Sequence, residues 1–220
     1  MFIGHFAPAL AARAITGETP QLGKLFVAAQ LVDIAFFTLV LGGIEHFRIT
    51  PGVTAMNPLD LYHYPYTHSL LGSAGWALGM AIAVWLVLRN AVAATWTGLV
   101  VLSHWMLDFV SHRPDLTLAG SGERLGLGLW NYPVAAVAAE LALFAAAFWW
   151  YLRRTRGPVL PPAVLAGVML ALQMVNWFGP EPAAADGSVA VTGLVAFGLL
   201  AALAYWVDAT RSHRGDIRLA

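Results

Sequence analysis

Histidine and aspartate side chains interrupt an apolar run between Ser103 and Asp115. On a helix, His104 and Asp108 stand one turn apart on one face, and His112 continues the same stripe. A neutral imidazole and a carboxylate can together coordinate a divalent cation. The structural alternative is a His-Asp hydrogen bond that joins two helices. The stripe therefore predicts either a metal site or a polar contact inside an apolar segment.

Further histidines and aspartates stand where a polar side chain needs a partner. Asp33 falls near the middle of an apolar segment, where an unpaired carboxylate costs several kcal/mol. His5 lies close to the start of another apolar segment, and His68 stands at the expected start of a helix with His63 five residues before it. Imidazole and carboxylate ligands often occur together at metal sites. We therefore predict one site whose metal ligands are His5, Asp33, His68, His104 and Asp108.

Such a site can perform hydrolysis. A metal that keeps an open coordination position lowers the pKa of bound water to about 7 and generates hydroxide beside the lipid headgroups. Two metals would grip both the attacking and the leaving oxygen of a phosphoester. We expect a divalent metal, zinc before manganese or iron, as one or two ions. The expected catalytic residues are Asp108 at the metal and His63 or His112 as the proton shuttle.

Composition places the chain in a membrane. Hydrophobic residues make up 59% of its 220 residues, charged residues only 11%, and the mean hydropathy is +0.69. These values are typical of an integral membrane protein. The net charge is zero and no basic block occurs, which argues against nucleic-acid binding. The chain has no cysteine, which excludes disulfides, thiolate nucleophiles and Cys-ligated metals.

Several apolar segments are long enough to cross a bilayer as helices. They cover residues 25–44, 67–88, 92–111, 130–152, 159–178 and 188–207. Residues 1–15 predict a short helix against the bundle, residues 45–65 an ordered or interfacial loop, and residues 113–129 a loop over the site. The sequence thus predicts an all-α fold, a polytopic transmembrane helical bundle of about six spans plus a short N-terminal helix.

Basic residues indicate the orientation of the bundle. If the spans alternate, the arginines after the second, fourth and sixth spans share one side of the membrane, whereas Glu181 and Asp186 lie on the other. Basic loops are normally cytoplasmic. We therefore expect a cytoplasmic C-terminus, a solvated His213 and a site that faces the non-cytoplasmic side. The arginines concerned are Arg89, Arg153, Arg154, Arg156, Arg211, Arg214 and Arg218.

Four motifs in this order resemble those of a known family. They are Gly4-His5, Leu31-Val32-Asp33-Ile34, His63-Tyr64-Pro65-Tyr66-Thr67-His68-Ser69-Leu70 and His104-x-x-x-Asp108. Over residues 1–130 the chain is similar to the bacterial inner-membrane proteins known as membrane-bound metal-dependent hydrolases. The histidine and aspartate order also resembles, more loosely, that of zinc-dependent phospholipases C. The resemblance implies an inner-membrane location and a metal-dependent activity.

The chain departs from the family pattern at two motifs. Family sequences typically read Pro-Asp-Ile-Asp at the second motif and His-Arg-Gly-x-Thr-His-Ser at the third. This chain has Ala35 in place of the second aspartate and Tyr64-Pro65 in place of Arg-Gly. The missing aspartate weakens the expectation of a second metal, and the missing arginine weakens that of a phosphate contact.

We therefore expect a membrane-embedded hydrolase of a lipid-like ester or phosphoester, whose partners are membrane lipids and that lipid-like small molecule. The oligomeric state is left open. The chain is expected to be one integral membrane domain, 1–220, with the metal site in residues 1–130 and supporting helices in residues 131–220.

Two alternatives to an enzyme remain. In a proton- or cation-coupled transporter or permease, Asp33, His104 and Asp108 would carry a proton or bind the transported cation, although the chain lacks an evident internal repeat. In a non-catalytic membrane protein, the same residues would form a structural metal clamp with a closed set of ligands.

Overall fold

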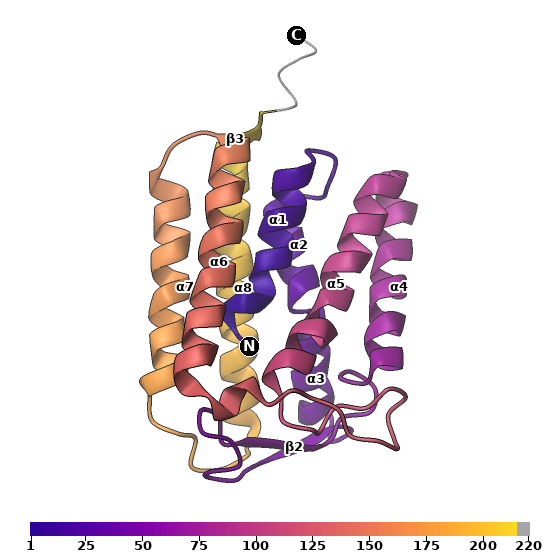
Figure 1. Cartoon of the computed structure of the whole chain (residues 1–220). Coiled ribbons are helices and arrows are strands. Elements are labelled where there is room, and N and C mark those ends of the chain that lie inside the picture. Colours follow the sequence, from indigo (N-terminus) through magenta and orange to yellow (C-terminus); the bar gives the residue numbers. More distant parts are fainter. Residues whose placement is uncertain (215–220) are drawn as a thin grey trace.

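The computed structural model describes residues 1–214 and is mostly helical (Figure 1). Its helices are η1 (Ile3–Phe6), α1 (Ala7–Ile15), α2 (Leu22–Ala29), α3 (Leu31–Leu41), α4 (Leu70–Leu88), α5 (Ala91–Ser111), η2 (Leu129–Asn131), α6 (Pro133–Arg154), α7 (Leu160–Phe178) and α8 (Gly187–Thr210). Two small sheets are formed by β1 (His46–Ile49) with β2 (Leu59–His63) and by β3 (Thr155–Arg156) with β4 (Ser212–His213). The dominance of helix was predicted, whereas the two sheets were not. Arg218 lies outside the described residues.

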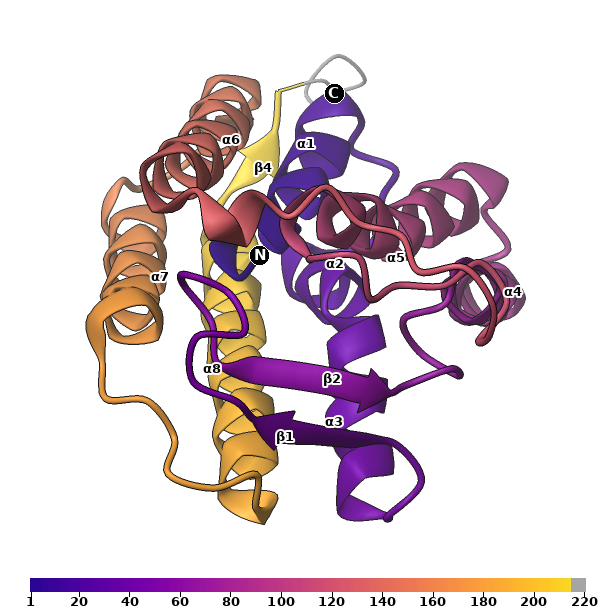
Figure 2. The same ribbon diagram turned by 60° about the horizontal axis from the view of Figure 1, so that its bottom comes forward.

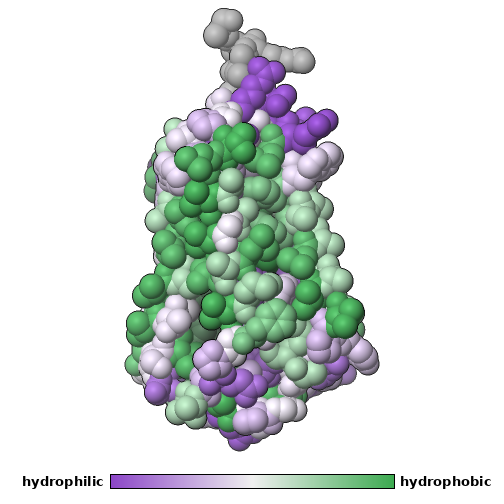
Figure 3. Space-filling view, turned by 90° about the vertical axis from the view of Figure 1, so that its left-hand side faces the viewer, coloured by the Kyte–Doolittle hydropathy of each residue, from purple (hydrophilic) through white to green (hydrophobic). Residues whose placement is uncertain are grey.

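Long apolar helices indicate a multi-pass membrane protein. Within residues 1–214, α4, α6, α7 and α8 are long and apolar enough to cross a membrane, and α2 with α3 adds a fifth candidate if the bent pair is one span. Figure 3 shows a broad hydrophobic band on one side of the molecule, with hydrophilic residues gathered at both ends. Helix α5 covers another expected span but is not among these candidates, because polar residues such as His104 and Asp108 lower its hydropathy.

The expected span over residues 25–44 is helical but interrupted. Helices α2 and α3 meet at Gln30 with a bend of 55°. The carbonyl oxygen of Ala29, just before the bend, accepts a hydrogen bond from Nδ1 of His104 at 2.9 Å. A side chain that bonds into the helix backbone is a recognised cause of helix bending. The bend brings the N-terminal turn of α3, which carries Asp33, beside α5.

Helices α4 and α5 pack side by side, and local signals set their ends (Figure 1). Side-chain oxygens cap the first turn of each helix: Ser69 accepts the N–H of Gly72, and Asn90 accepts that of Ala93, both at 3.0 Å. Arg89 adopts a left-handed φ of 52°, which ends α4 and turns the chain into α5. The start of α4 and the end of α5 therefore lie at the same end of the bundle.

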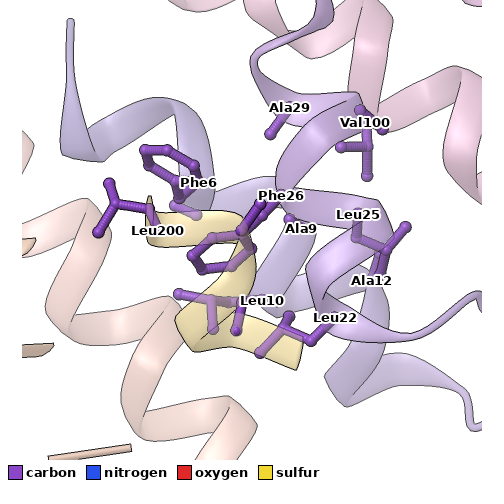
Figure 4. Packing of buried hydrophobic residues seen from close by; sticks show 14 of the residues in the cluster. Phe6, Ala9, Leu10, Ala12, Leu22, Leu25, Phe26, Ala29, Val100 and Leu200 are labelled. Atoms are coloured by element: carbon purple, nitrogen blue, oxygen red, sulfur yellow. The ribbon is translucent and has the colours of Figure 1, made fainter. Parts of the chain in front are cut away.

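The short N-terminal helix lies against the bundle, as predicted, and apolar packing holds it there. Phe6 and Leu10 are almost completely buried against Phe26 of α2 and Leu200 of α8 (Figure 4). The rings of Phe6 and Phe26 lie 4.6 Å apart. Close van der Waals packing of this kind drives helix association in membranes. The first residues of the chain thus lie inside the bundle (Figure 1).

A hairpin and a long loop cover one end of the bundle (Figure 2). The antiparallel strands β1 and β2 lie within the segment expected to be a loop, and Arg48 Nε donates to Asp60 Oδ2 across them at 2.5 Å. Arg113, at the start of the long loop, also pairs with Asp60. The carbonyl oxygen of Thr117 accepts the N–H of Leu70 at 3.0 Å. These contacts fix the loop against the start of α4.

The opposite end of the bundle carries β3 and β4 (Figure 1). His213, which was expected to be solvated, is instead buried there. Its Nε2 lies 3.2 Å from the carbonyl oxygen of Ala14, so this histidine contacts the backbone near the end of α1 instead of solvent.

Candidate metal centre

Two imidazoles and two carboxylates converge between α3, α5 and the start of α4. Oδ1 of Asp33 lies 3.2 Å from Nε2 of His68 and 3.5 Å from Nε2 of His104. Oδ2 of Asp108 lies 3.2 Å from Nε2 of His104 and 3.7 Å from Nε2 of His68. Only the Asp33 side chain is appreciably exposed among these four, at 23%. The structure thus brings together four residues predicted as ligands.

The hydrogen bond of His104 decides which ring nitrogen faces the cluster. Its Nδ1 lies 2.9 Å from the carbonyl oxygen of Ala29, which can only accept, so Nδ1 carries the hydrogen. In the neutral ring Nε2 then carries a lone pair instead of a hydrogen, and it has no hydrogen-bond partner among the described residues. That lone pair faces carboxylate oxygens of Asp33 and Asp108.

A relay of polar side chains orients His68 in the same way. The Thr67 hydroxyl donates to Oε2 of Glu45 at 2.6 Å, so its oxygen accepts the hydrogen of His68 Nδ1 at 2.9 Å. Nε2 of His68 therefore also presents a lone pair to the carboxylates. Neither Thr67 nor Glu45 was predicted. Thr67 could have been found from its place beside His68, whereas the contact of Glu45 spans 22 positions and leaves no local signal.

Lone pairs that face carboxylates require a positive charge between them. A divalent cation supplies it and balances the two carboxylates. Tetrahedral ligands at about 2.0–2.2 Å from zinc lie about 3.3–3.6 Å from one another. Four of the six separations among these ligand atoms, 3.2, 3.2, 3.5 and 3.7 Å, are close to this spacing. Protonation of both imidazoles is the alternative source of positive charge. The ligand types and their separations fit a metal ion.

The other oxygen of Asp108 faces a second group of side chains. Its Oδ1 lies 3.1 Å from Nε2 of His5 and 3.5 Å from Nε2 of His112. The ring of His5 stacks on that of His104 with centroids 3.8 Å apart. Nδ1 of His112 lies 3.1 Å from Oδ1 of Asp115, which orients this ring toward Asp108. The predicted ligand His5 and the predicted shuttle His112 thus meet at one carboxylate.

Two residues of α6 and α7 hold the segment that carries His5. Oε1 of Glu140 accepts the backbone N–H groups of Phe2 at 2.5 Å and Gly4 at 3.0 Å. Oε1 of Gln173 accepts the N–H between them at 3.1 Å. The orphan donors at the start of a helix are thereby satisfied inside the bundle. Glu140 and Gln173 are structural partners of His5 rather than members of the cluster.

His63, the other predicted shuttle, is not brought to the cluster. It is exposed at the end of β2, and its ring centroid lies 5.8 Å from that of His46. It lines a small cavity together with His68 and Tyr64. Burial raises the pKa of Tyr64, and the neighbouring carboxylate of Asp115 raises it further, so the Tyr64 hydroxyl stays protonated.

No protein-family model, curated protein or solved structure matches this chain. The similarity to membrane-bound metal-dependent hydrolases therefore rests on the sequence motifs. The described residues themselves support a membrane protein with two buried groups that can hold a metal. These groups are His5, His104 and Asp108, and Asp33, His68 and His104.

Proposed function

We propose that this protein is a membrane-embedded, metal-dependent hydrolase of a lipid-like ester or phosphoester. The observation that carries the proposal is a pair of imidazole lone pairs, on His68 and His104, that face two carboxylates inside an apolar bundle. Ionisable groups within a membrane are costly and normally mark function. The donor set suits zinc first, and manganese or iron second. Asp33, His68 and His104 would hold one ion with Asp108 beside it, and His5 supports a second near Asp108.

The side chains around the centre suggest how each contributes to hydrolysis. A bound divalent metal supplies Lewis acidity and makes water acidic near neutral pH. His112 is the favoured proton acceptor, because its Nε2 lies 3.5 Å from Oδ1 of Asp108 while Asp115 holds its Nδ1. His63 is the weaker candidate, since it is exposed outside the cluster. The relay behind His68 keeps that ring in the orientation needed to hold the metal.

We further propose a bacterial inner-membrane protein with six spans, in which α2 with α3 counts as one span and α5 as another. More arginines lie at the end that carries β3 than at the other end, where Arg48, Arg113 and Arg124 lie, and this bias supports a cytoplasmic C-terminus and a site toward the other face. Membrane lipids are then the surrounding partners. Residues 1–130 would form the metal-site half of one integral domain, and residues 131–220 would support it.

Cysteine labelling tests this orientation. The chain has no cysteine, and Ser121 and Arg156 are both exposed at opposite ends of the bundle. In intact cells, Ser121→Cys should react with an impermeant thiol reagent and Arg156→Cys should not. Labelling in the reverse pattern would contradict the orientation.

Hydrolysis is tested on purified protein supplied with zinc and a panel of lipid esters and phosphoesters. Asp108→Asn keeps the size of the side chain but removes the negative charge that faces both His5 and His104. The value of kcat/KM should therefore fall by about 100-fold or more. His46→Ala is the control, because His46 lies outside the cluster. Full activity in Asp108→Asn would contradict the proposal.

The broken span favours one second candidate, a cation-coupled transporter. Interrupted helices with a buried carboxylate often form ion sites in transporters. Here the bend of 55° at Gln30 lies one turn from Asp33. Proton-coupled uptake into proteoliposomes that depends on Asp33, in protein without bound metal, would replace the hydrolase with this candidate.

A further inference from the structure

A small cavity lies beside the metal centre, between the turn that precedes α4 and the loop that follows α5. Its volume is about 30 Å³, and His68 forms part of its wall. Gly120 has a φ of +84°, and a Cβ there would lie 2.9 Å from Cβ of Pro65. A glycine is therefore needed for the loop to close over the turn. The cavity is lined by Tyr62, His63, Tyr64, Pro65, His68, Asp115, Thr117, Gly120 and Arg124.

Tyr64 brings an unused hydrogen-bond donor to this cavity. Tyr64 is 5% exposed, and its hydroxyl has no hydrogen-bond partner within 3.5 Å among the described residues, although the carboxylate of Asp115 lies near enough to act on it. A buried hydroxyl without a partner costs stability, so such a group calls for an explanation. The ring is fixed by edge contacts with His68, at 5.3 Å between centroids, and with Phe36, at 6.3 Å. Tyr64 is thus a pre-positioned donor.

Arg124 adds positive charge at the same cavity. One guanidinium nitrogen donates to the carbonyl oxygen of Asp115 at 2.7 Å, and within residues 1–214 the guanidinium has no carboxylate partner. The carboxylate of Asp115 does not compete for it, because this carboxylate already pairs with His112 at 3.1 Å and with Arg113 at 3.3 Å. The cavity therefore offers two donors, and the cationic one has no carboxylate within 4.0 Å among the described residues, although Asp115 also lines the cavity.

We propose that this cavity binds a phosphoryl group, with Tyr64 and Arg124 donating to its non-bridging oxygens beside His68. The proposal rests on the proposed function and assigns that hydrolase a phosphoester substrate rather than a carboxylic ester. A guanidinium and a phenol match the charge and the acceptors of phosphate, whereas a neutral ester carbonyl would leave Arg124 unpaired. A cavity this small holds about one or two water-sized groups, so it admits one or two phosphoryl oxygens while the rest of the phosphate stays at its mouth, and it excludes an acyl chain.

Phosphate binding to the full chain tests this assignment. Inorganic phosphate is titrated calorimetrically into purified, zinc-supplied protein in detergent. Tyr64→Phe and Arg124→Gln should each weaken phosphate binding about tenfold, because each removes a donor to the anion. Tyr66→Phe removes an exposed tyrosine hydroxyl that does not line the cavity, and Arg156→Gln removes a charge at the other end of the bundle. Both controls should bind within about twofold of the wild type.

Two further measurements identify the source of the phosphoryl group and the chemical class of the ligand. Displacement of phosphate by short-chain phosphatidic acid would identify a lipid headgroup as the source, and its failure to displace would identify soluble phosphate; either result keeps the phosphoryl site. Acetate that bound as tightly, with the same dependence on Arg124, would overturn it. So would a wild type that bound no phosphate, or binding that neither Tyr64→Phe nor Arg124→Gln weakened.

Metal content measured on the same samples keeps this test separate from that of the proposed function. Bound metal with phosphate affinity independent of Tyr64 and Arg124 would overturn the phosphoryl site alone. Phosphate affinity that depends on both residues in protein without metal would support the cavity and contradict the hydrolase.

Discussion

Two carboxylates buried in this apolar bundle, those of Glu140 and Asp108, face different partners. Glu140 accepts two backbone N–H groups, at 2.5 and 3.0 Å, and lies 3.4 Å from Nε2 of Gln173. Oδ2 of Asp108 instead faces Nε2 of His104 at 3.2 Å, and that nitrogen carries a lone pair in the neutral ring, while Oδ1 of Asp108 lies 3.4 Å from the N-terminal ammonium of Met1. Acceptors that face donors stabilise a fold, whereas acceptors that face acceptors need a cation. Burial alone therefore does not identify a site.

The largest loss of metal affinity is expected when a direct ligand is removed. His68→Ala should lower metal affinity by more than about 100-fold, because loss of an outer partner alone typically costs about 10–100-fold. Competition with a fluorescent zinc chelator on the purified variant measures this. Metal affinity equal to that of the wild type would remove His68 from the centre and with it the contrast to Glu140.

The second largest loss of metal affinity is expected when the relay behind His68 is broken. Thr67→Val keeps the shape of the side chain but removes the acceptor that orients His68, so zinc affinity should fall about 10–100-fold. Thr97→Val is a matched control, because Thr97 is equally buried and its hydroxyl donates only to the carbonyl oxygen of Ala93 within α5. Equal affinities in the two valine variants would show that the relay has no role.

His5 should have a smaller effect than His68. His5 lies 3.1 Å from Oδ1 of Asp108 and stacks on His104, so His5→Ala should reduce zinc retention about tenfold. His46→Ala, outside the cluster, should leave retention unchanged. The sequence placed His5 among the metal ligands, and the comparison of His5→Ala with His46→Ala and His104→Ala decides how closely His5 is coupled to the metal.

Glu140 should affect metal affinity least and the stability of the fold most. Glu140→Ala leaves two buried N–H groups without an acceptor, which should lower the free energy of unfolding by about 2–6 kcal/mol. Zinc affinity of the folded fraction should change by less than about threefold. Thermal unfolding in detergent gives the first quantity and chelator competition the second. A large loss of zinc affinity with unchanged stability would reverse the comparison.

The members of the cluster could be identified from the sequence because a polar side chain in an apolar segment costs free energy unless it has a partner. Asp33, His68, His104 and Asp108 were each found as costly exceptions to a hydrophobic pattern, and they do converge. His5 was found by the same reasoning. Long apolar helices were predicted for a similar reason, since length and hydropathy are local properties.

Features that depend on distant partners could not be predicted. The bend at Gln30 is set by a hydrogen bond between Ala29 and His104, which stand 75 positions apart. The role of Glu45 depends on Thr67 in the same way. His63 was predicted as a shuttle because it neighbours His68 in sequence, yet β2 carries its side chain to the surface. Proximity in sequence is a poor guide wherever a strand or loop turns a residue away.

Metal analysis of the purified protein tests the central claim most directly. His104 contacts both carboxylates of the cluster, at 3.2 and 3.5 Å, so its loss should empty the centre. Wild-type protein expressed with zinc should retain at least about one divalent ion per chain, and His104→Ala should retain almost none. A wild type without stoichiometric metal, or a folded His104→Ala variant that keeps its metal, would contradict the account.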